Sequence, residues 1–270
     1  MEFRESLHGG SLAPDAILFV DQETGRSPEL AALTRAMSER GRVVVLGGSL
    51  HDSGMVALLR ERALDHVIGD QGTPDEHELA VTSAKLHSGD IFGLEKYMAW
   101  GVQVTEIEVA SYADKVAALD QLGRSAESVG ARRRLVNRIQ STADELLMNA
   151  LYDAPSAASA SGAASAGPSA LLRYGCDGRH VAVSVLDRFG LLDKRAVVDA
   201  VLRARAELGR PRTEGGAGLG LYFVLSSVTR FIVNVQPGRL TEVVCLFDLR
   251  ERGRDAAGWA RSLHVFTAGM

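Results

Sequence analysis

The sequence predicts an α+β fold, a mixed-sheet α/β sandwich preceded by a small N-terminal α/β module. Three observations lead to this prediction. Short apolar runs alternate with helix-like stretches at the start of the chain, an alternating strand pattern followed by two helices comes next, and two pairs of apolar strands joined by tight turns follow near the end. At 270 residues the chain is long enough for one large domain or two ordinary ones.

The N-terminal module is expected over residues 1–89, followed by a connector over 90–101. Short apolar runs predict buried strands, and the stretches between them predict helices. Strands that alternate with helices favour a parallel sheet with right-handed crossovers. The expected strands are 16–20, 42–48 and 65–70, and the expected helices are about 28–40, 53–63 and 74–89.

The second domain is expected over residues 102–250. Within it, the Ala/Ser/Gly-rich stretch 155–169 has the composition of a flexible insert, because it cannot bury enough apolar surface to order itself. Residues 188–214 read as a polar, mixed segment, and residues 251–270 as a C-terminal tail. The expected strands are 102–110, 231–236 and 242–249, with a hairpin over 171–187. The expected helices are about 111–128 and 131–153, and 215–228 is expected to turn from a glycine-rich loop into an apolar helix.

Composition and charge narrow the range of partners. The net charge of −4 and the pI near 6.0 give no electrostatic footprint for nucleic acid. No apolar run is long enough to cross a bilayer, and the first residues lack the pattern of a signal peptide. Cys176 and Cys245 are isolated and fall in predicted strands, so we expect free thiols in a reducing compartment and a cytoplasmic protein.

Glu145 and Asn149 stand four residues apart on the predicted helix 131–153 and therefore lie one above the other. The pair falls at the edge of the apolar stripe of that helix. A solvated flank and a functional pair explain the spacing equally well at this point. The stripe consists of Leu135, Ile139, Ala143, Leu146, Ala150 and Leu151.

A glycine-rich loop stands directly before the apolar helix expected at the end of 215–228. Its glycines are Gly215, Gly216, Gly218 and Gly220. Glycines in that position let backbone N–H groups approach a phosphate, and a helix N-terminus favours negative charge. The loop lacks the Lys-Ser/Thr ending of a P-loop, and a tight turn between two elements is the alternative explanation.

Asp187 ends an apolar strand, and Gly190 follows three residues later. A carboxylate at a strand end can accept a hydrogen bond from the amino group of a base while the chain turns away. A turn-forming aspartate is the alternative explanation of the same pattern.

The order of these motifs resembles the ATP-binding domain shared by gyrase, Hsp90, histidine kinases and MutL, over about residues 100–250. Glu145 and Asn149 match the first motif of that domain, Asp187 and Gly190 the second, and the glycine-rich loop the third. The strand and two helices that lead into the first motif look most like those of the anti-sigma-factor serine kinases. The resemblance implies ATP and Mg²⁺ as cofactors, with Asn149 as the metal ligand and Glu145 as the general base. Asp187 would then bind the adenine amino group and residues 191–214 would form a lid. Gly190 matches the second motif, and Gly216, Gly218 and Gly220 would shape the phosphate pocket.

The second motif departs from the pattern of the family, which usually reads Asp-x-Gly-x-Gly. Phe189 and Leu191 stand at the two glycine positions. A phenylalanine there would either stack on adenine or fill the pocket. The resemblance therefore implies a Ser/Thr-kinase-like regulator that acts on a partner protein. The alternatives are a catalytically inactive, nucleotide-gated interaction or scaffold module and, from Phe189 alone, a scaffold that binds no nucleotide. A homodimer is consistent with the superfamily, and no nucleic-acid or membrane partner is expected.

The N-terminal module has a resemblance of its own, to the later strands of a response-regulator receiver domain. Asp21 would stand at the phospho-acceptor position and Ser49 at the switch hydroxyl. The early acidic pair and the lysine of receivers have no counterpart, so the resemblance implies a degenerate, truncated receiver used for association. His77, on the expected helix 74–89, is interpreted as a surface residue and not as a phospho-accepting histidine.

Overall fold

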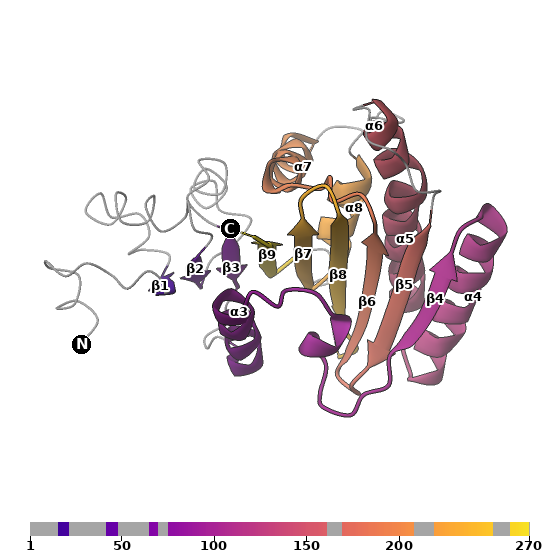
Figure 1. The fold of residues 1–270 in the computed structure, drawn as a ribbon. Helices are drawn as coiled ribbons and strands as arrows, with labels where there is room; N and C mark the ends of the chain where they lie inside the picture. The colour runs from indigo at the N-terminus through magenta and orange to yellow at the C-terminus, as the bar shows by residue number, and fades with distance from the viewer. Residues whose placement is uncertain are drawn as a thin grey trace, which may run out of the picture.

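The computed structural model describes residues 16–21, 42–47, 65–69, 75–160, 169–207, 219–250 and 260–269. They contain a single mixed sheet with the strand order β1-β2-β3-β9-β7-β8-β6-β5-β4 (Figure 1). The predicted α+β class with a mixed sheet is confirmed. The strands are β1 (Leu18–Asp21), β2 (Val43–Leu46), β3 (His66–Ile68), β4 (Thr105–Val109), β5 (Ala170–Cys176), β6 (His180–Asp187), β7 (Arg230–Gln236), β8 (Leu240–Asp248) and β9 (Ser262–Thr267).

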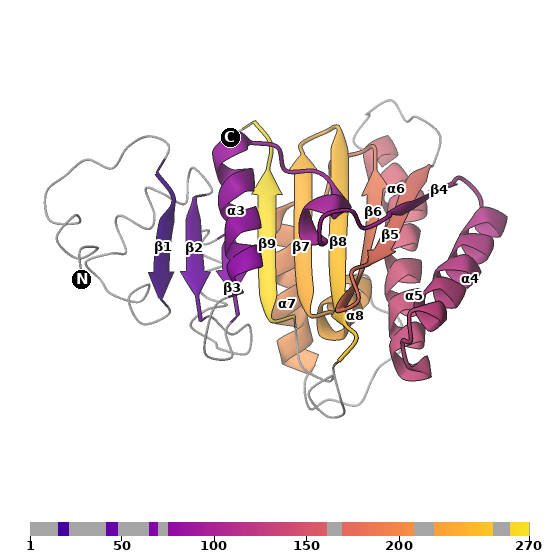
Figure 2. The ribbon, with the colours of Figure 1, turned by 90° about the horizontal axis from the view of Figure 1, so that it is seen from below.

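Helices cover both faces of the sheet. In Figure 2, α3 and the 3₁₀ helix η2 lie in front of the strands, and α5, α7 and α8 lie behind them. The helices are α3 (Glu76–Ser88), η2 (Leu94–Tyr97), α4 (Tyr112–Ser128), α5 (Arg133–Met148), the π-helical turn η3 (Asn149–Asp153), α6 (Ala154–Ala160), α7 (Lys194–Glu207) and α8 (Leu219–Ser227). None of the described helices is long and apolar enough to cross a membrane.

The three N-terminal strands pair in parallel, as their alternation with helix-like stretches predicts. Helix α3 also forms where expected, and the side chain of Asp75 caps it by accepting from the N–H groups of His77 and Glu78. The expected helices 28–40 and 53–63 lie outside the described residues, as does Ser49.

In place of the expected C-terminal tail, residues 262–267 form the buried strand β9. It pairs in parallel with β7 and antiparallel with β3, so a single sheet runs from the N-terminal strands to β4. The sequence SLHVFT hides this strand because Ser262 and His264 interrupt the apolar run, and both side chains turn out to be buried. Whether residues 1–89 fold as an independent domain stays a prediction.

Two further stretches differ from expectation. Residues 155–160 of the predicted insert belong to α6 (Ala154–Ala160), and residues 161–168 of that insert lie outside the described part of the chain. Residues 194–207 of the segment read as polar and mixed form α7, which is capped at its start by the side chain of Asp193. Val197, Val198 and Ala200 of α7 pack into the main core. Burial of this apolar face stabilises the helix.

The predicted hairpin over 171–187 is confirmed as β5 and β6, which pair antiparallel around Asp177 and Gly178. Helices α4 and α5 follow β4, with Gly130 in a left-handed conformation at φ 85° between them. The apolar stripe of α5 faces the core as predicted: Ile139, Ala143 and Leu146 are buried. Cys176 and Cys245 are both free thiols in strands.

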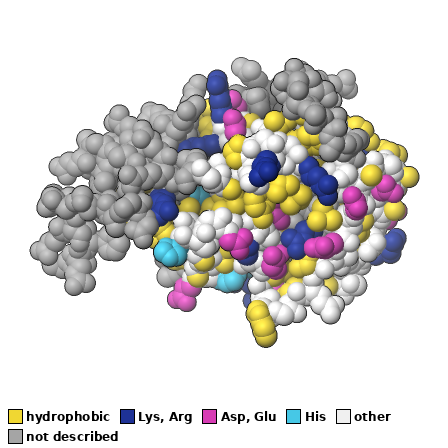
Figure 3. All heavy atoms as spheres, viewed as in Figure 1, with side chains coloured by type: hydrophobic (Ala, Val, Ile, Leu, Met, Phe, Trp, Pro, Cys, Tyr) yellow, Lys and Arg dark blue, Asp and Glu magenta, His cyan; other side chains and the backbone are white. Residues whose placement is uncertain are grey.

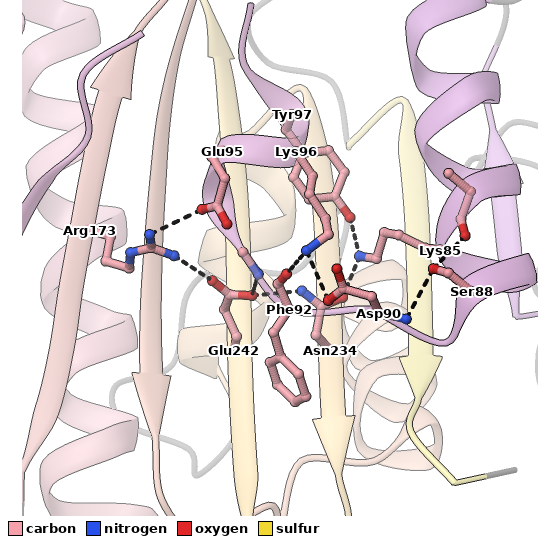
Figure 4. A network of polar contacts seen from close by, with 12 residues as sticks. Lys85, Ser88, Asp90, Phe92, Glu95, Lys96, Tyr97, Arg173, Asn234 and Glu242 are labelled. Carbon is pink, nitrogen blue, oxygen red and sulfur yellow. Dashed lines mark hydrogen bonds and ion pairs between the residues drawn. The ribbon is translucent and has the colours of Figure 1, made fainter. Parts of the chain in front are cut away.

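The segment with η2 is fixed to the sheet by a buried polar network (Figure 4). Lys85 is 1% exposed, and its Nζ donates to the Tyr97 hydroxyl and to Asn234 Oδ1, the latter at 2.7 Å. Asn234 Nδ2 in turn donates to Glu242 Oε2 at 2.9 Å, and the Gly93 N–H donates to the same oxygen at 2.8 Å. Burial lowers the pKa of Lys85 and raises that of Tyr97.

Arg173 extends this network toward the edge of the sheet. Its guanidinium pairs with Glu95 at 3.0 Å and with Glu106 at 2.7 Å, and its Nη1 lies 3.8 Å from Glu242 Oε1. Basic and acidic side chains lie next to one another on this face in the space-filling view (Figure 3). The sheet face under η2 is therefore held by interlocked polar contacts as well as by apolar packing.

A second buried polar cluster lies where α3 packs on β7 and β9. His264 Nε2 lies 3.1 Å from Glu78 Oε1, and Arg230 Nε lies 3.0 Å from Glu78 Oε2. Burial lowers the pKa of His264. Burial works against ionisation of Glu78, but the hydrogen bond from His264 and the charge of Arg230 outweigh it and leave the pKa of Glu78 lowered. Glu78 is thus a buried carboxylate held between two cationic or hydrogen-bonding partners.

Candidate functional site

Glu145 and Gly220, assigned to separate motifs, are neighbours in the structure. A Cβ built on Gly220 would collide with Glu145 Oε2. Gly220 is the second residue of α8, so the Glu145 carboxylate lies against the N-terminal turn of that helix. The contact is with the movable end of the Glu145 side chain, so it shows that the two residues are neighbours without by itself requiring a glycine at position 220.

The Glu145 carboxylate is half-buried, and its pKa is raised. Burial is the largest cause, and the charges of Asp144 and Asp153 act in the same direction, whereas Lys115 opposes them. A carboxyl group with a raised pKa holds a proton more readily than an exposed glutamate. This is the direction that general base catalysis requires of a glutamate.

Asn149 lies where α5 changes its winding. The helix ends at Met148, and a π-helical turn runs over Asn149–Asp153, with the Asn149 N–H donating to the carbonyls of Glu145 and Leu146. Single π-helical turns inside α-helices are frequent at functional sites. Asn149 is half-buried, so its amide is neither packed into the core nor fully surrounded by solvent.

Asp187 and Gly190 form the turn after β6. Asp187 Oδ1 accepts from the Phe189 N–H at 2.8 Å and from the Gly190 N–H at 3.3 Å. Burial raises the pKa of Asp187, and the two backbone hydrogen bonds act against that rise. These bonds use one carboxylate oxygen and orient the side chain at the strand end.

Gly190 brings this turn against the turn between β7 and β8. It adopts φ 63°, and a Cβ on it would lie 2.7 Å from Gly238 N and closer still to Gln236 O. The Gly238 N–H also donates to the Gly190 carbonyl at 3.1 Å. Gly190 is therefore required by close backbone approach, whatever it does for a ligand.

Phe189, which stands at the first glycine position of the second motif, is 7% exposed. The structure thus buries the ring instead of presenting it on the surface. This burial fits the interpretation that the ring fills part of the space beside Asp187, and the choice between filling the pocket and stacking on a base stays a prediction.

The three motifs come from elements that touch one another. Helix α5 contacts α8 and β6, and the π-helical turn contacts β6, whose last residue is Asp187. Gly216 and Gly218 lie outside the described residues, as does Gly215, and so does 208–214 of the expected lid. The structure therefore joins Glu145 with Gly220 and Asp187 with Gly190, and it leaves the rest of the phosphate loop untested.

The donor set suits Mg²⁺ only with help from a ligand. No group of three or more His, Cys, Asp or Glu side chains among the described residues could hold a metal ion. Magnesium often uses one or two protein oxygens, with waters and substrate phosphates completing its shell. The amide oxygen of Asn149 fits that role, with Glu145 one helical turn earlier.

Lys115 is a residue of this region that the sequence analysis missed. It is 5% exposed, and its Nζ lies 2.5 Å from Asp144 Oδ1 and 3.2 Å from Met148 Sδ. The contact joins α4 to the helix that carries Glu145 and Asn149. Because the pair is 29 positions apart in sequence, helical spacing could not have revealed it.

Comparison with known proteins adds little. No protein-family model matches this sequence, and no curated protein does. One similar solved structure is "The crystal structure of SiaB-SiaC complex from Pseudomonas aeruginosa", with a TM-score of 0.38 and 14% identity, covering 54% of this chain and 89% of that chain. A likeness of this size supports no conclusion about this protein.

Proposed function

We propose that this chain binds Mg-ATP and acts as a Ser/Thr-kinase-like regulator of a partner protein. The observation that carries the proposal is the placement of the Glu145 carboxylate against the first turn of α8, the helix that follows the glycine-rich loop. A nucleotide phosphate bound at that helix end would lie next to Glu145, because helix N-termini attract anions.

In this proposal each residue has a limited task. Asn149 would hold Mg²⁺, which supplies charge neutralisation to the phosphates when bound. Asp187 would accept the hydrogen bond of the adenine amino group beside the Thr241 hydroxyl, which also interacts with its carboxylate, while Oδ1 is held by the two backbone N–H groups of its own turn. Glu145 would accept the proton of the attacking serine or threonine hydroxyl, and the raised pKa of its carboxyl makes it a stronger base than an exposed glutamate.

Phe189 favours a second candidate, a nucleotide-gated interaction module without turnover. The buried ring stands where the family has a glycine. A bound nucleotide and the lid of residues 191–214 would therefore pack against each other differently from those of a family member with that glycine. This module would bind ATP and change its affinity for a partner without transferring phosphate.

Substituting Glu145 with Gln separates the two candidates. A kinase should lose phosphoryl transfer by about 10²- to 10⁴-fold, because the general base is gone, and should still bind Mg-ATP. The measurement is transfer of label from γ-labelled ATP to proteins of a cell extract, with the exposed Glu127→Gln variant as the matched control. Label transfer by wild type and Glu127→Gln alone supports the kinase, whereas ATP binding without transfer by any variant supports the inactive module.

A further inference from the structure

Helices α4 and α5 carry an exposed apolar surface beside the candidate site. It consists of Tyr112 (66% exposed) and Val116 (42%) on α4, with Met148 (37%) and Tyr152 (42%) at the end of α5 and in the π-helical turn. We call these four residues the Tyr112–Tyr152 surface. It contains four of the seven large hydrophobic side chains that are exposed in the described part of the chain.

Contacts of Lys115 make this surface continuous. Its Nζ lies 5.2 Å from the centre of the Tyr112 ring, 3.2 Å from Met148 Sδ and 2.5 Å from Asp144 Oδ1. Spacings of four residues place Val116 beside Tyr112, and Tyr152 beside Met148. The apolar groups of two helices are therefore held together, although solvent reaches all four of them.

The border of the surface is acidic. Asp144 is 41% exposed and pairs with the buried Lys115 at 2.5 Å, Glu145 is the next residue of α5, and Asp153 is exposed directly after Tyr152. Lys115 offsets the charge of Asp144, and a positively charged partner would offset the charges of Glu145 and Asp153.

We propose that the Tyr112–Tyr152 surface docks a basic segment of a partner protein that carries an apolar anchor. This inference rests on the proposed function and names its substrate class: the docked segment would flank the serine or threonine presented to Glu145. Exposed tyrosines supply contact area at low entropic cost, and the acidic border selects arginine or lysine beside the anchor.

The probe for this proposal is a fluorescent 16-residue peptide with leucine on one helical face, arginine on the other and one central serine. Fluorescence anisotropy with the full chain measures its affinity at low and moderate salt. We expect binding that weakens with salt, and at least about a tenfold loss in Tyr112→Ser/Tyr152→Ser and a smaller loss in Asp153→Asn. Trp100→Ser, and Glu76→Gln on α3, both exposed and outside the Tyr112–Tyr152 surface, are the matched controls and should bind as wild type.

Equal affinity in the surface variants and the controls would overturn the proposal, as would equal binding of a peptide with glutamate in place of arginine. A concentration-dependent dimer that Tyr112→Ser/Tyr152→Ser dissociates, with no peptide binding, would assign the surface to a second copy instead. Circular dichroism confirms that each variant is folded. Peptide binding by a wild-type chain whose melting temperature Mg-ATP does not raise would refute the proposed function and leave the docking surface standing, so the two failures are distinguishable.

Discussion

Replacing Lys85 with Met is expected to lower the free energy of unfolding by about 3 kcal/mol. The substitution keeps most of the side-chain volume and removes the donor that Asn234 Oδ1 and the Tyr97 hydroxyl share. Both partners are buried, so neither can turn to water for a replacement. Urea unfolding followed by circular dichroism measures the loss as a lower midpoint at unchanged slope.

Lys96→Met is the matched control for this result. Lys96 lies in the same segment, but its ion-pair partner Asp90 is 72% exposed, so we expect a cost below about 1 kcal/mol. A Lys85→Met protein that unfolds at the same urea concentration as Lys96→Met would mean that the hydrogen bonds of Lys85 to Tyr97 and Asn234 in Figure 4 contribute nothing beyond an exposed ion pair.

Substitution of Gly190 with Ala should destabilise the protein by about 3 kcal/mol or more. The left-handed backbone alone costs roughly 1–2 kcal/mol for a residue with a Cβ. The new methyl group would in addition collide with the backbone of the β7–β8 turn, including Gly238 N at 2.7 Å. Because the two turns cannot simply separate without breaking the hydrogen bond from Gly238 to Gly190, the strain should spread to Asp187.

Gly238→Ala isolates the contribution of the collision. Gly238 also has a positive φ, of 69°, but a Cβ on it would meet nothing within 4 Å. We expect it to cost only the roughly 1–2 kcal/mol of backbone strain. Thermal unfolding of both variants gives the difference, and equal melting temperatures would show that the close approach at Gly190 is not maintained in solution.

Much of the fold follows from local pattern. The hairpin of β5 and β6 and the helices α3, α4 and α5 were predictable because alternation, caps and apolar stripes act over a few residues. Strand β9 was not, since the polar side chains of Ser262 and His264 find partners only after β3, β7 and α3 have come together. The sequence of helix α7 does contain a signal, because Asp193 can cap a helix and apolar residues follow it at helical spacing. The many charged residues of the segment made this signal hard to recognise.

The candidate site was predictable in a different way. The four-residue spacing of Glu145 and Asn149 gave no more than an even choice between a solvated flank and a functional pair. The contact between Glu145 and Gly220 joins residues 75 positions apart. In the sequence, only the resemblance to the ATP-binding domain indicated that the two belong to one site. Lys85 and Asn234 are separated by 149 positions, and no local rule connects them. Long-range polar pairs of this kind depend on the order of the strands in the sheet, and hydrophobic periodicity does not predict that order.

The most direct test of the central claim is thermal unfolding with and without Mg-ATP, on wild type, Asn149→Ala and the control Asn137→Ala, which alters an exposed asparagine on the same helix. A ligand at about 100 times its dissociation constant stabilises the native state by roughly 2.7 kcal/mol, which raises the melting temperature of a chain of this size by a few degrees. We expect this rise in wild type and Asn137→Ala and its loss in Asn149→Ala. Identical melting temperatures with and without millimolar Mg-ATP in wild type would contradict the claim that this chain binds the nucleotide.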